Sequence, residues 1–431
     1  MRSVTIEPIV EQGLCNSCGT CFSACPKNAI ELVRSNRTHT FYPRIRLNEC
    51  SNCGLCYRVC PGGVFDFNQS NINIFGRLPP ESKEGILLGN HINCYSGYST
   101  NDQVRFNSSS GGLVSELLIF MLEERIIDGA LVTRMNPENP LEPESFIART
   151  PEEISLSSGS KYCPVSANVA LKEILDHRGK YAVVGLPCHI QGVRKAEEVF
   201  KVLRNRVILH LGLFCTHNDS FLETDFILHH LGIDRQDVSA ISYRGKGWPG
   251  NLRVRTKTGK EFSIRFEDWV DFHTYCFFSQ NRCLLCCDQS AEFADVSFGD
   301  AWLPQFLNDK IGTSIAISRT EGAEKILREA VSEGRIKLDP LPASDVVRSQ
   351  GMMRFKKNSF VVRSLLLKSL GTKIPQYNVR LPSPGLIDWP RSGMILFNRL
   401  FASPEYWGML SGMTKLQKGL EKLYARFLPY A

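Results

Sequence analysis

Half of the sixteen cysteines in this chain stand in two copies of one spacing near its start. The first copy is Cys15, Cys18, Cys21 and Cys25 before Pro26, and the second, 35 residues later, is Cys50, Cys53, Cys56 and Cys60 before Pro61. Three thiolates at two-residue gaps can wrap one corner of a cubic 4Fe-4S cluster, so the fourth ligand must come from elsewhere in the chain. In two-cluster ferredoxins each run lends its last cysteine, the one before proline, to the other cluster.

The duplicated spacing therefore predicts two 4Fe-4S clusters that exchange their fourth ligands. The predicted ligands of the first cluster are Cys15, Cys18, Cys21 and Cys60, and those of the second are Cys50, Cys53, Cys56 and Cys25. Zinc also takes four thiolates, but zinc does not call for this spacing twice with a proline each time. The iron–sulfur interpretation is therefore favoured over a pair of zinc sites.

A second group of cysteines lies further along the chain. The remaining eight are Cys94, Cys163, Cys188, Cys215, Cys276, Cys283, Cys286 and Cys287. Cys283 and Cys286 have ligand spacing, while Cys188 and Cys215 each follow an apolar, strand-like run, where the loops of an α/β core converge. These four could form a third cluster, but spacing alone leaves open that Cys188 and Cys215 are ordinary buried thiols.

The composition favours a reducing compartment for these thiols. The chain has 431 residues, enough for two or three domains. Its first thirteen residues contain Glu7 and Glu11 and no apolar signal-peptide core, so we expect a cytoplasmic protein whose closely spaced cysteines bind metal rather than form disulfides. The most apolar helical stretch, 113–122, is about half a membrane span and is interrupted by Ser115 and Glu116.

The elements that must position these residues indicate a mixed α/β (α+β) fold. The expected parts are a ferredoxin-like module at 1–75 with short strands at 29–33 and 41–47, an exposed linker at 76–93, a mixed core at 94–340, and a helical tail at 341–431. Within the core we expect helices at 113–125 and 165–175, strands at 94–98, 130–133, 181–185 and 207–214, and antiparallel strands at 241–266. After residue 322 the pattern is mostly helical.

The tail differs from the rest of the chain in charge. Residues 341–431 carry fourteen Lys and Arg but only four Asp and Glu, a formal charge of +10 in a chain whose total is +7. This region is either a solvated helical surface or a docking face for a partner subunit or an anionic membrane, which would make the protein peripheral at the inner face of the membrane. Nucleic acid is disfavoured because the basic residues do not accompany a recognisable binding motif.

Several local motifs across residues 94–330 together resemble the beta-subunit family of coenzyme F420 hydrogenases and dehydrogenases, which includes F420H2 dehydrogenase input subunits and hydroxymethyl chlorophyll reductases. In order they are Arg105-Phe106-Asn107-Ser108-Ser109-Ser110-Gly111-Gly112, Gly159-Ser160-Lys161-Tyr162, Gly185-Leu186-Pro187-Cys188-His189, Gly212-Leu213-Phe214-Cys215, Tyr243-Arg244-Gly245-Lys246-Gly247-Trp248-Pro249-Gly250, Cys283 to Cys286, Ala294-Asp295 and Gly299-Asp300-Ala301-Trp302. The resemblance divides the core into the family's N-terminal domain at 94–178 and its C-terminal domain at 179–340.

The resemblance also implies cofactors. It implies a bound FAD and a third 4Fe-4S cluster held by Cys188, Cys215, Cys283 and Cys286. Cys287 departs from the pattern, because it directly follows Cys286 and could replace it as the ligand.

The flavin contacts that the resemblance implies centre on a serine–glycine turn. They are Arg105, Ser108, Ser109, Ser110, Gly111, Gly112, Lys161 and Tyr162. Glycines let backbone N–H groups approach a ligand, and the helix that follows would offer its positive end to the FAD pyrophosphate. The alternative is that a serine simply caps this helix. Arg105 and Lys161 pair with flavin phosphate or ring oxygen, or are surface charges.

The glycines Gly245, Gly247 and Gly250 mimic a dinucleotide-binding fingerprint. We reject that interpretation because the following residues alternate like a strand, whereas the fingerprint opens a helix. Trp248 and Lys246 could instead stack on, and pair with, a flat anionic cofactor such as coenzyme F420.

The resulting expectation is an iron–sulfur flavoprotein. Reduced coenzyme F420 would give a hydride to FAD, and electrons would pass singly through the core cluster and the ferredoxin clusters to another redox subunit or a ferredoxin-type acceptor, or in the reverse direction. No side-chain catalyst is assigned, because the cofactor carries the chemistry. The alternatives are the same core acting on another organic substrate, chlorophyll-reductase-like or polysaccharide-associated, or a non-catalytic electron relay.

Overall fold

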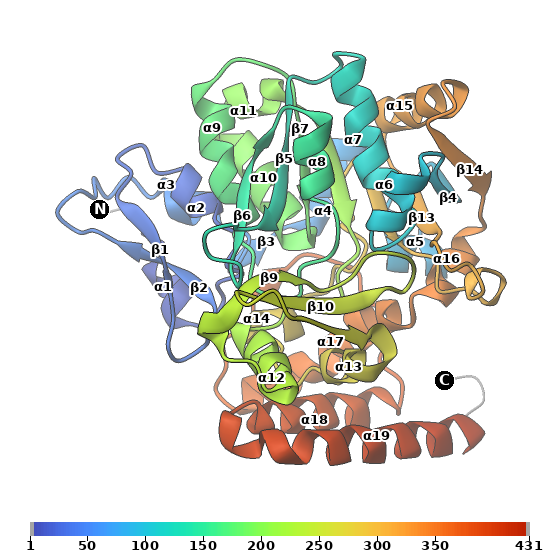
Figure 1. Cartoon of the computed structure of the whole chain (residues 1–431). Helices are drawn as coiled ribbons and strands as arrows, with labels where there is room; N and C mark the ends of the chain where they lie inside the picture. The colour runs from blue at the N-terminus through green and yellow to red at the C-terminus, as the bar shows by residue number, and fades with distance from the viewer. Residues whose placement is uncertain (1–3, 428–431) are drawn as a thin grey trace.

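The computed structural model describes residues 4–427, and its centre is an eight-stranded mixed sheet with the strand order β14-β4-β13-β12-β8-β7-β5-β6 (Figure 1). The strands are β4 (Asn93–Ser99), β5 (Gly129–Met135), β6 (Pro143–Ala148), β7 (Tyr181–Gly185), β8 (Val207–Leu213), β12 (Val296–Asp300), β13 (Ser314–Ser318) and β14 (Ile336–Pro340). The four central strands β5, β7, β8 and β12 run parallel, and the outer pairs are antiparallel. The expected mixed α/β fold is confirmed.

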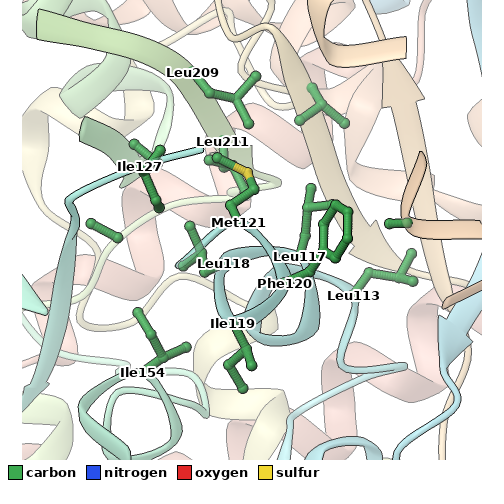
Figure 2. Close-up of a cluster of buried hydrophobic side chains, with 14 of the residues drawn as sticks. Leu113, Leu117, Leu118, Ile119, Phe120, Met121, Ile127, Ile154, Leu209 and Leu211 are labelled. Carbon is green, nitrogen blue, oxygen red and sulfur yellow. The ribbon is translucent and has the colours of Figure 1, made fainter. Parts of the chain in front are cut away.

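Both faces of this sheet are covered by helices, which is why its central strands read as nearly continuous apolar runs. One face packs against α7 (Leu113–Glu123) and α15 (Glu321–Ser332), and the other against α9 (Leu171–Asp176), α10 (Pro187–Val199) and α11 (Lys201–Arg206). Figure 2 shows α7 in the first of these cores, with Met121 beside Leu211 of β8. The structure also buries Ile119 and Ile154 in this core.

A smaller antiparallel sheet lies beside the large one. Its strands are β9 (Val238–Ser242), β10 (Asn251–Thr256) and β11 (Glu261–Arg265), as expected for 241–266. An aromatic core joins this sheet to α12 (Phe221–Leu231), α13 (Phe266–Thr274) and the C-terminal helix α19 (Trp407–Phe427). Figure 1 shows α18 (Asp388–Asn398) and α19 along one edge of the molecule, beneath α12 and α13.

The N-terminal module shows the sequence duplication in its backbone. Its antiparallel strands are β1 (Ile30–Arg34) and β2 (Phe41–Ile45), and each cysteine run enters a short helix, α2 (Thr20–Ser23) or α3 (Leu55–Arg58). Gly19 and Gly54, 35 residues apart, occupy the same left-handed position before these helices, with φ of 82° and 75°. A side chain at Gly19 would also meet the backbone of Val169, so the turn is pressed against the core.

The expected exposed linker is partly buried. It contains α5 (Lys83–Leu88), whose Leu87 and Leu88 pack in a core with α16 (Ala343–Ser349). Composition pointed to exposure because Pro79 and Pro80 and several charges surround these two leucines.

The basic C-terminal region is helical, as expected, but it is not a separate tail. Its helix α17 (Gly351–Ser369) lies inside the molecule, and Lys356, Lys357 and Arg363 on it are 0–2% exposed. The following strand β15 (Gln376–Tyr377) pairs with β3 (Val64–Phe65) of the N-terminal module. Part of the charge counted in the sequence therefore lies inside the protein.

The other helical segments connect these parts. They are α1 (Glu7–Glu11), α4 (Phe67–Phe75), α6 (Asp102–Asn107), α8 (Pro151–Leu156), η1 (Ala167–Ala170), η2 (Arg235–Asp237), α14 (Asn281–Leu284), η3 (Pro304–Phe306), η4 (Arg399–Phe401) and η5 (Pro404–Tyr406). Among residues 4–427, no helix has both the length and the apolar character needed to cross a membrane.

Candidate functional site

A cavity of about 550 Å³ opens at the carboxyl ends of the parallel strands. Thr133, Gly185, Leu213 and Gly299, from β5, β7, β8 and β12, contribute to its wall. Ligands of open α/β sheets bind at this edge because loops from neighbouring strands meet there. The volume lies within the range of about 300–1,000 Å³ usual for small-molecule and cofactor sites.

The N-terminus of α7 faces this cavity. Leu113, Val114 and Ser115, the first turn of the helix, line the wall together with Ser108, Ser109, Ser110 and Gly112 of the preceding turn. The residue before the helix is Gly112, in a left-handed conformation with φ of 78°, and no side chain caps the helix. The serine-cap alternative is therefore wrong, and the first backbone N–H groups of α7 are open to an anion.

Lys161 lies in the cavity wall, where its ammonium group binds the backbone carbonyl oxygens of a turn. Its Nζ donates to the carbonyl oxygens of Ser157 at 2.5 Å and Gly159 at 2.8 Å, just beyond α8. Burial lowers its pKa from 10.5 to about 8, since no carboxylate among the described residues pairs with it. The backbone N–H of Ser160 donates to Ser109 Oγ, which joins the two family motifs in one wall.

An ion pair forms the aromatic side of the cavity. The Arg244 guanidinium donates to both carboxylate oxygens of Asp300, at 2.9 and 3.2 Å, and to the Ser109 carbonyl at 2.6 Å. It lies over the ring of Phe266, which stacks on Trp302 with centroids 5.9 Å apart. Burial opposes the charge of Arg244, but Asp300 outweighs it and raises the pKa of the guanidinium further.

Four of the residues proposed as cofactor contacts do not line the cavity. Arg105 forms an ion pair with Asp309 at 2.7 Å, and the backbone of Gly111 packs against β4 and β13 instead. Lys246 is exposed, and Trp248 lies one layer behind the wall, where its indole N–H donates to Asp300 and its ring contacts Trp302. Ser108, Ser109, Ser110, Gly112, Lys161 and Tyr162 do line the cavity.

A buried group of His217, Asp219 and His273 completes the wall near β8. His273 Nδ1 bonds to Asp219 Oδ2, and the two imidazole rings stack with centroids 4.0 Å apart. Burial and the adjacent His273 lower the pKa of His217 to about 4, so His217 is neutral at physiological pH. Although the ligand atoms lie within 4.8 Å of one another, two face-to-face imidazoles cannot both direct a nitrogen lone pair at one metal ion. The group instead supplies hydrogen bonds and one negative charge.

Cys188, Cys215, Cys283 and Cys286 converge beside this wall. Cys188 begins α10, Cys215 follows β8 and lines the cavity, and the other two belong to α14 and the turn after it. Burial, together with the neighbouring sulfurs of the group, raises the pKa of the Cys188 thiol well above its usual value. Four thiolates so close together in a dry site need a bound cation, so the group fits an iron–sulfur cluster.

Cys287 points away from this group. Its side chain is fully buried among Phe65, Phe293 and other apolar residues, and Lys357 is the charged residue that affects its pKa most. Cys286 is therefore the residue of the pair that the structure brings to the other three thiols.

The N-terminal cysteines lie in two groups, and each group contains the last cysteine of the other run. Burial and the sulfurs of Cys60 and Cys18 raise the pKa of Cys15 to about 12. The other set lines one small pocket of its own and consists of Cys25, Cys50, Cys53 and Cys56. Backbone N–H groups donate to the sulfurs of both sets: Ser17 to Cys15 and Asn52 to Cys50, each at 3.4 Å, Gly62 to Cys60 and Ala29 to Cys25, each at 3.3 Å. N–H···S bonds of this kind are typical of cluster ligands.

The three groups lie in series. Cys215 is in the cavity wall, and Cys18 is close enough to Cys188 to raise the pKa of its thiol. Cys56 acts in the same way on Cys21, which connects the two N-terminal groups. Cys53 of the last group is exposed at the surface. The arrangement forms a chain of thiol groups from the cavity to solvent.

Sequence reasoning missed Arg244, Asp300 and the histidine–aspartate group as parts of the wall. Arg244 and Asp300 lie within the quoted motifs, but the backbone turns Arg244 inward and Lys246 outward, which spacing does not reveal. His217 and Asp219 carried a weaker signal, their position just after Cys215 at the end of a strand.

Comparison with known families agrees with this geometry. Residues 178–344 match the family described as the C terminus of the coenzyme F420 hydrogenase/dehydrogenase beta subunit, and residues 94–172 match the corresponding N-terminal family. Residues 14–64 match a 4Fe-4S dicluster domain.

One relative settles the family. The coenzyme F420 hydrogenase subunit beta of Methanothermobacter thermautotrophicus is 30% identical over 264 residues, which are 59% of this chain and 87% of the relative. This chain belongs to the coenzyme F420 hydrogenase/dehydrogenase beta-subunit family. The resemblance expected from its motifs is confirmed, and the protein is an iron–sulfur member of an oxidoreductase family.

Two further comparisons extend the match. A subunit of the F420H2 dehydrogenase of Methanosarcina mazei is 26% identical over 363 residues, 82% of this chain and 93% of the relative. A chain of the F420-reducing [NiFe] hydrogenase complex from Methanosarcina barkeri shares the fold with a TM-score of 0.54 and 25% identity, covering 69% of this chain and 98% of that one.

Proposed function

We propose that this protein is an iron–sulfur flavoprotein that exchanges electrons between reduced coenzyme F420 and one-electron acceptors, with one FAD and three 4Fe-4S clusters. The observation that carries the proposal is the contact between the 550 Å³ cavity and the first thiol group, since Cys215 belongs to both. Electrons can pass from a bound hydride carrier to a one-electron carrier only if the two binding sites lie next to each other.

The residues of the cavity fit FAD. The uncapped first turn of α7 and the Lys161 ammonium would hold the pyrophosphate, because both present positive charge to the cavity, while the Glu116 carboxylate of that turn is paired with Arg335. Phe266, Trp302 and Tyr162 would flank the ring system. When bound there, FAD would supply two-electron hydride chemistry on one side and single-electron exchange on the other.

The chain's own residues position and shield this chemistry. The Arg244–Asp300 ion pair holds the loop of Ser109 and the aromatic wall in one place. The buried His217–Asp219–His273 group keeps a fixed negative charge and hydrogen bonds at the wall nearest Cys215. Preorganised groups of this kind act without reorganising during the reaction.

The proposed cluster ligands are the three sets of four cysteines. They are Cys188, Cys215, Cys283 and Cys286 in the core, Cys15, Cys18, Cys21 and Cys60 next, and Cys25, Cys50, Cys53 and Cys56 at the surface. The exposed Cys53 marks the face at which another redox subunit or a ferredoxin-type acceptor would dock. The membership of the relatives in hydrogenase and dehydrogenase assemblies supports a partner subunit.

The test is anaerobic purification with counts of iron, sulfide and flavin, followed by addition of reduced coenzyme F420. About twelve irons, one FAD and rapid bleaching are expected from three four-iron clusters. Twelve irons and FAD without bleaching would keep the cofactors and move the search to another organic substrate. Eight irons and no flavin would refute the proposal and leave the electron-relay alternative.

A further inference from the structure

Lys356 is a buried lysine without an anionic side chain as partner. It lies on α17 with 1% of its surface exposed, and its Nζ donates to the Cys283 carbonyl oxygen at 3.2 Å. No carboxylate of the described residues forms an ion pair with it. An ammonium group is costly to bury unless a negative charge lies nearby.

The negative charge that would face Lys356 belongs to the core group, whose cysteines are thiolates when they bind a cluster. Cys286, Cys215 and Cys283 are all close enough to Lys356 to act on it electrostatically.

The next residue provides a natural comparison. Lys357 is as deeply buried as Lys356, at 2% exposure, but it forms an ion pair with Glu292 at 2.5 Å. Its neighbouring thiol is Cys287, which lies outside the core group. Successive residues of one helix thus hold a paired and an unpaired buried charge.

We propose that Lys356 is a positioning residue for electron transfer: its fixed positive charge beside Cys215, Cys283 and Cys286 raises the reduction potential of the core cluster. This inference rests on the third cluster of the proposed function. Reduction adds one negative charge to a site already made negative by four thiolates, and a buried cation stabilises the reduced form more than the oxidised form.

The source of this charge is a segment that the family matches do not include. The matched C-terminal family ends at residue 344, whereas α17 begins at residue 351. The proposal therefore gives a role in electron transfer to a segment beyond the matched families.

The experiment is an anaerobic redox titration of the purified full-length protein, followed by electron paramagnetic resonance, which reports the clusters separately. Lys356→Met removes the charge, and Lys356→Arg keeps it. The control is the double variant Lys357→Met with Glu292→Gln, which removes a neighbouring charge pair of equal burial. Iron is counted in every sample.

Lys356→Met should lower the equilibrium constant for reduction of one cluster by at least about tenfold, which is about 59 mV for one electron. The other two clusters, Lys356→Arg and the double control should keep wild-type potentials. Loss of four irons from Lys356→Met alone, with Lys356→Arg intact, would also support the charge role.

Unchanged potentials in Lys356→Met with all irons present would overturn the inference. Equal shifts or equal iron loss in the Met and Arg variants would overturn it as well, because only packing would then matter. Eight irons in the wild-type protein would show that the third cluster itself is absent, so that the failure belongs to the proposed function.

Discussion

The affinity for FAD should fall at alkaline pH because of Lys161. Its pKa of about 8 means that the ammonium loses its proton well below the 10.5 of an ordinary lysine. Above pH 8 an anionic pyrophosphate must therefore bind together with a proton, and its affinity falls by up to tenfold for each pH unit until the pKa of the complex is reached. Between pH 7 and pH 9 the expected loss is about tenfold.

The sign for stability is the opposite in the flavin-free protein. Between pH 8 and 10.5 the unfolded lysine binds more protons than the folded one, so the Lys161 contribution to the free energy of unfolding rises with pH in that window. The positive charge of Lys161 thus destabilises the flavin-free protein and would stabilise its complex with FAD, which is typical of a binding residue.

The assay is fluorescence quenching of FAD by flavin-depleted protein that keeps its iron, measured from pH 7 to 9.5. Lys161→Met should bind FAD weakly and with little pH dependence. Riboflavin, which lacks phosphate, serves as the second ligand and should bind the wild-type protein equally at all these pH values. If Lys161→Met binds FAD with the same pH slope as the wild-type protein, the slope is not due to Lys161. If riboflavin shows the same pH slope as FAD on the wild-type protein, Lys161 contacts the flavin ring and not the phosphate.

Three other predictions concern the thiols, the helix turn and the C-terminal surface. Cys286→Ser should lower the iron count by about four, whereas Cys287→Ser should retain it, and the reverse result would exchange the ligands. Gly112→Ala forces a side chain onto a residue with φ of 78° and should destabilise the protein by about 1 kcal/mol in denaturant titrations while weakening FAD binding. In the basic C-terminal region the side chains of Trp389 and Leu400 are 47% and 67% exposed. If this region contacts a membrane, the protein should sediment with anionic vesicles at low salt, and Trp389→Ser should prevent the sedimentation. Equal binding to neutral vesicles would contradict that prediction.

The grouping of the cysteines, in which each run contributes its last member to the other group, was predictable because cluster chemistry fixes the spacing. A four-iron cluster demands its cysteines at set intervals, and the duplication repeats even the left-handed glycines Gly19 and Gly54. The strands β7 and β8 were also predictable, since strands covered on both faces are nearly continuous apolar runs. The sites at their carboxyl ends followed from topology.

Residue orientation within a motif was less predictable. Trp248 and Trp302 both occur in family motifs, yet only Trp302 reaches the cavity. Gly245, Lys246 and Gly247 all have positive φ, so the loop reverses direction within three residues, and alternation no longer tells which side chain faces inward. Backbone hydrogen bonds from Gly247 and Trp248 to Phe106 and Lys310 then set the outcome, and these partners are remote in sequence.

Charge counting misled for a related reason. A formal charge of +10 over the C-terminal region predicts an exposed basic surface only if its residues are solvated. In the structure Lys356, Lys357 and Arg363 instead enter the interior, where thiols, Glu292 and backbone carbonyls receive them. An interior rich in thiols that bind iron stabilises buried positive charges, because each cluster carries excess negative charge into a low-dielectric site. Arg282 follows the same rule: it is buried without a carboxylate partner among the described residues and acts on the thiols of both Cys18 and Cys283. In this chain, therefore, the burial of individual Lys and Arg side chains, and not their number, separates those that face the thiols from those that are available to a partner or a membrane.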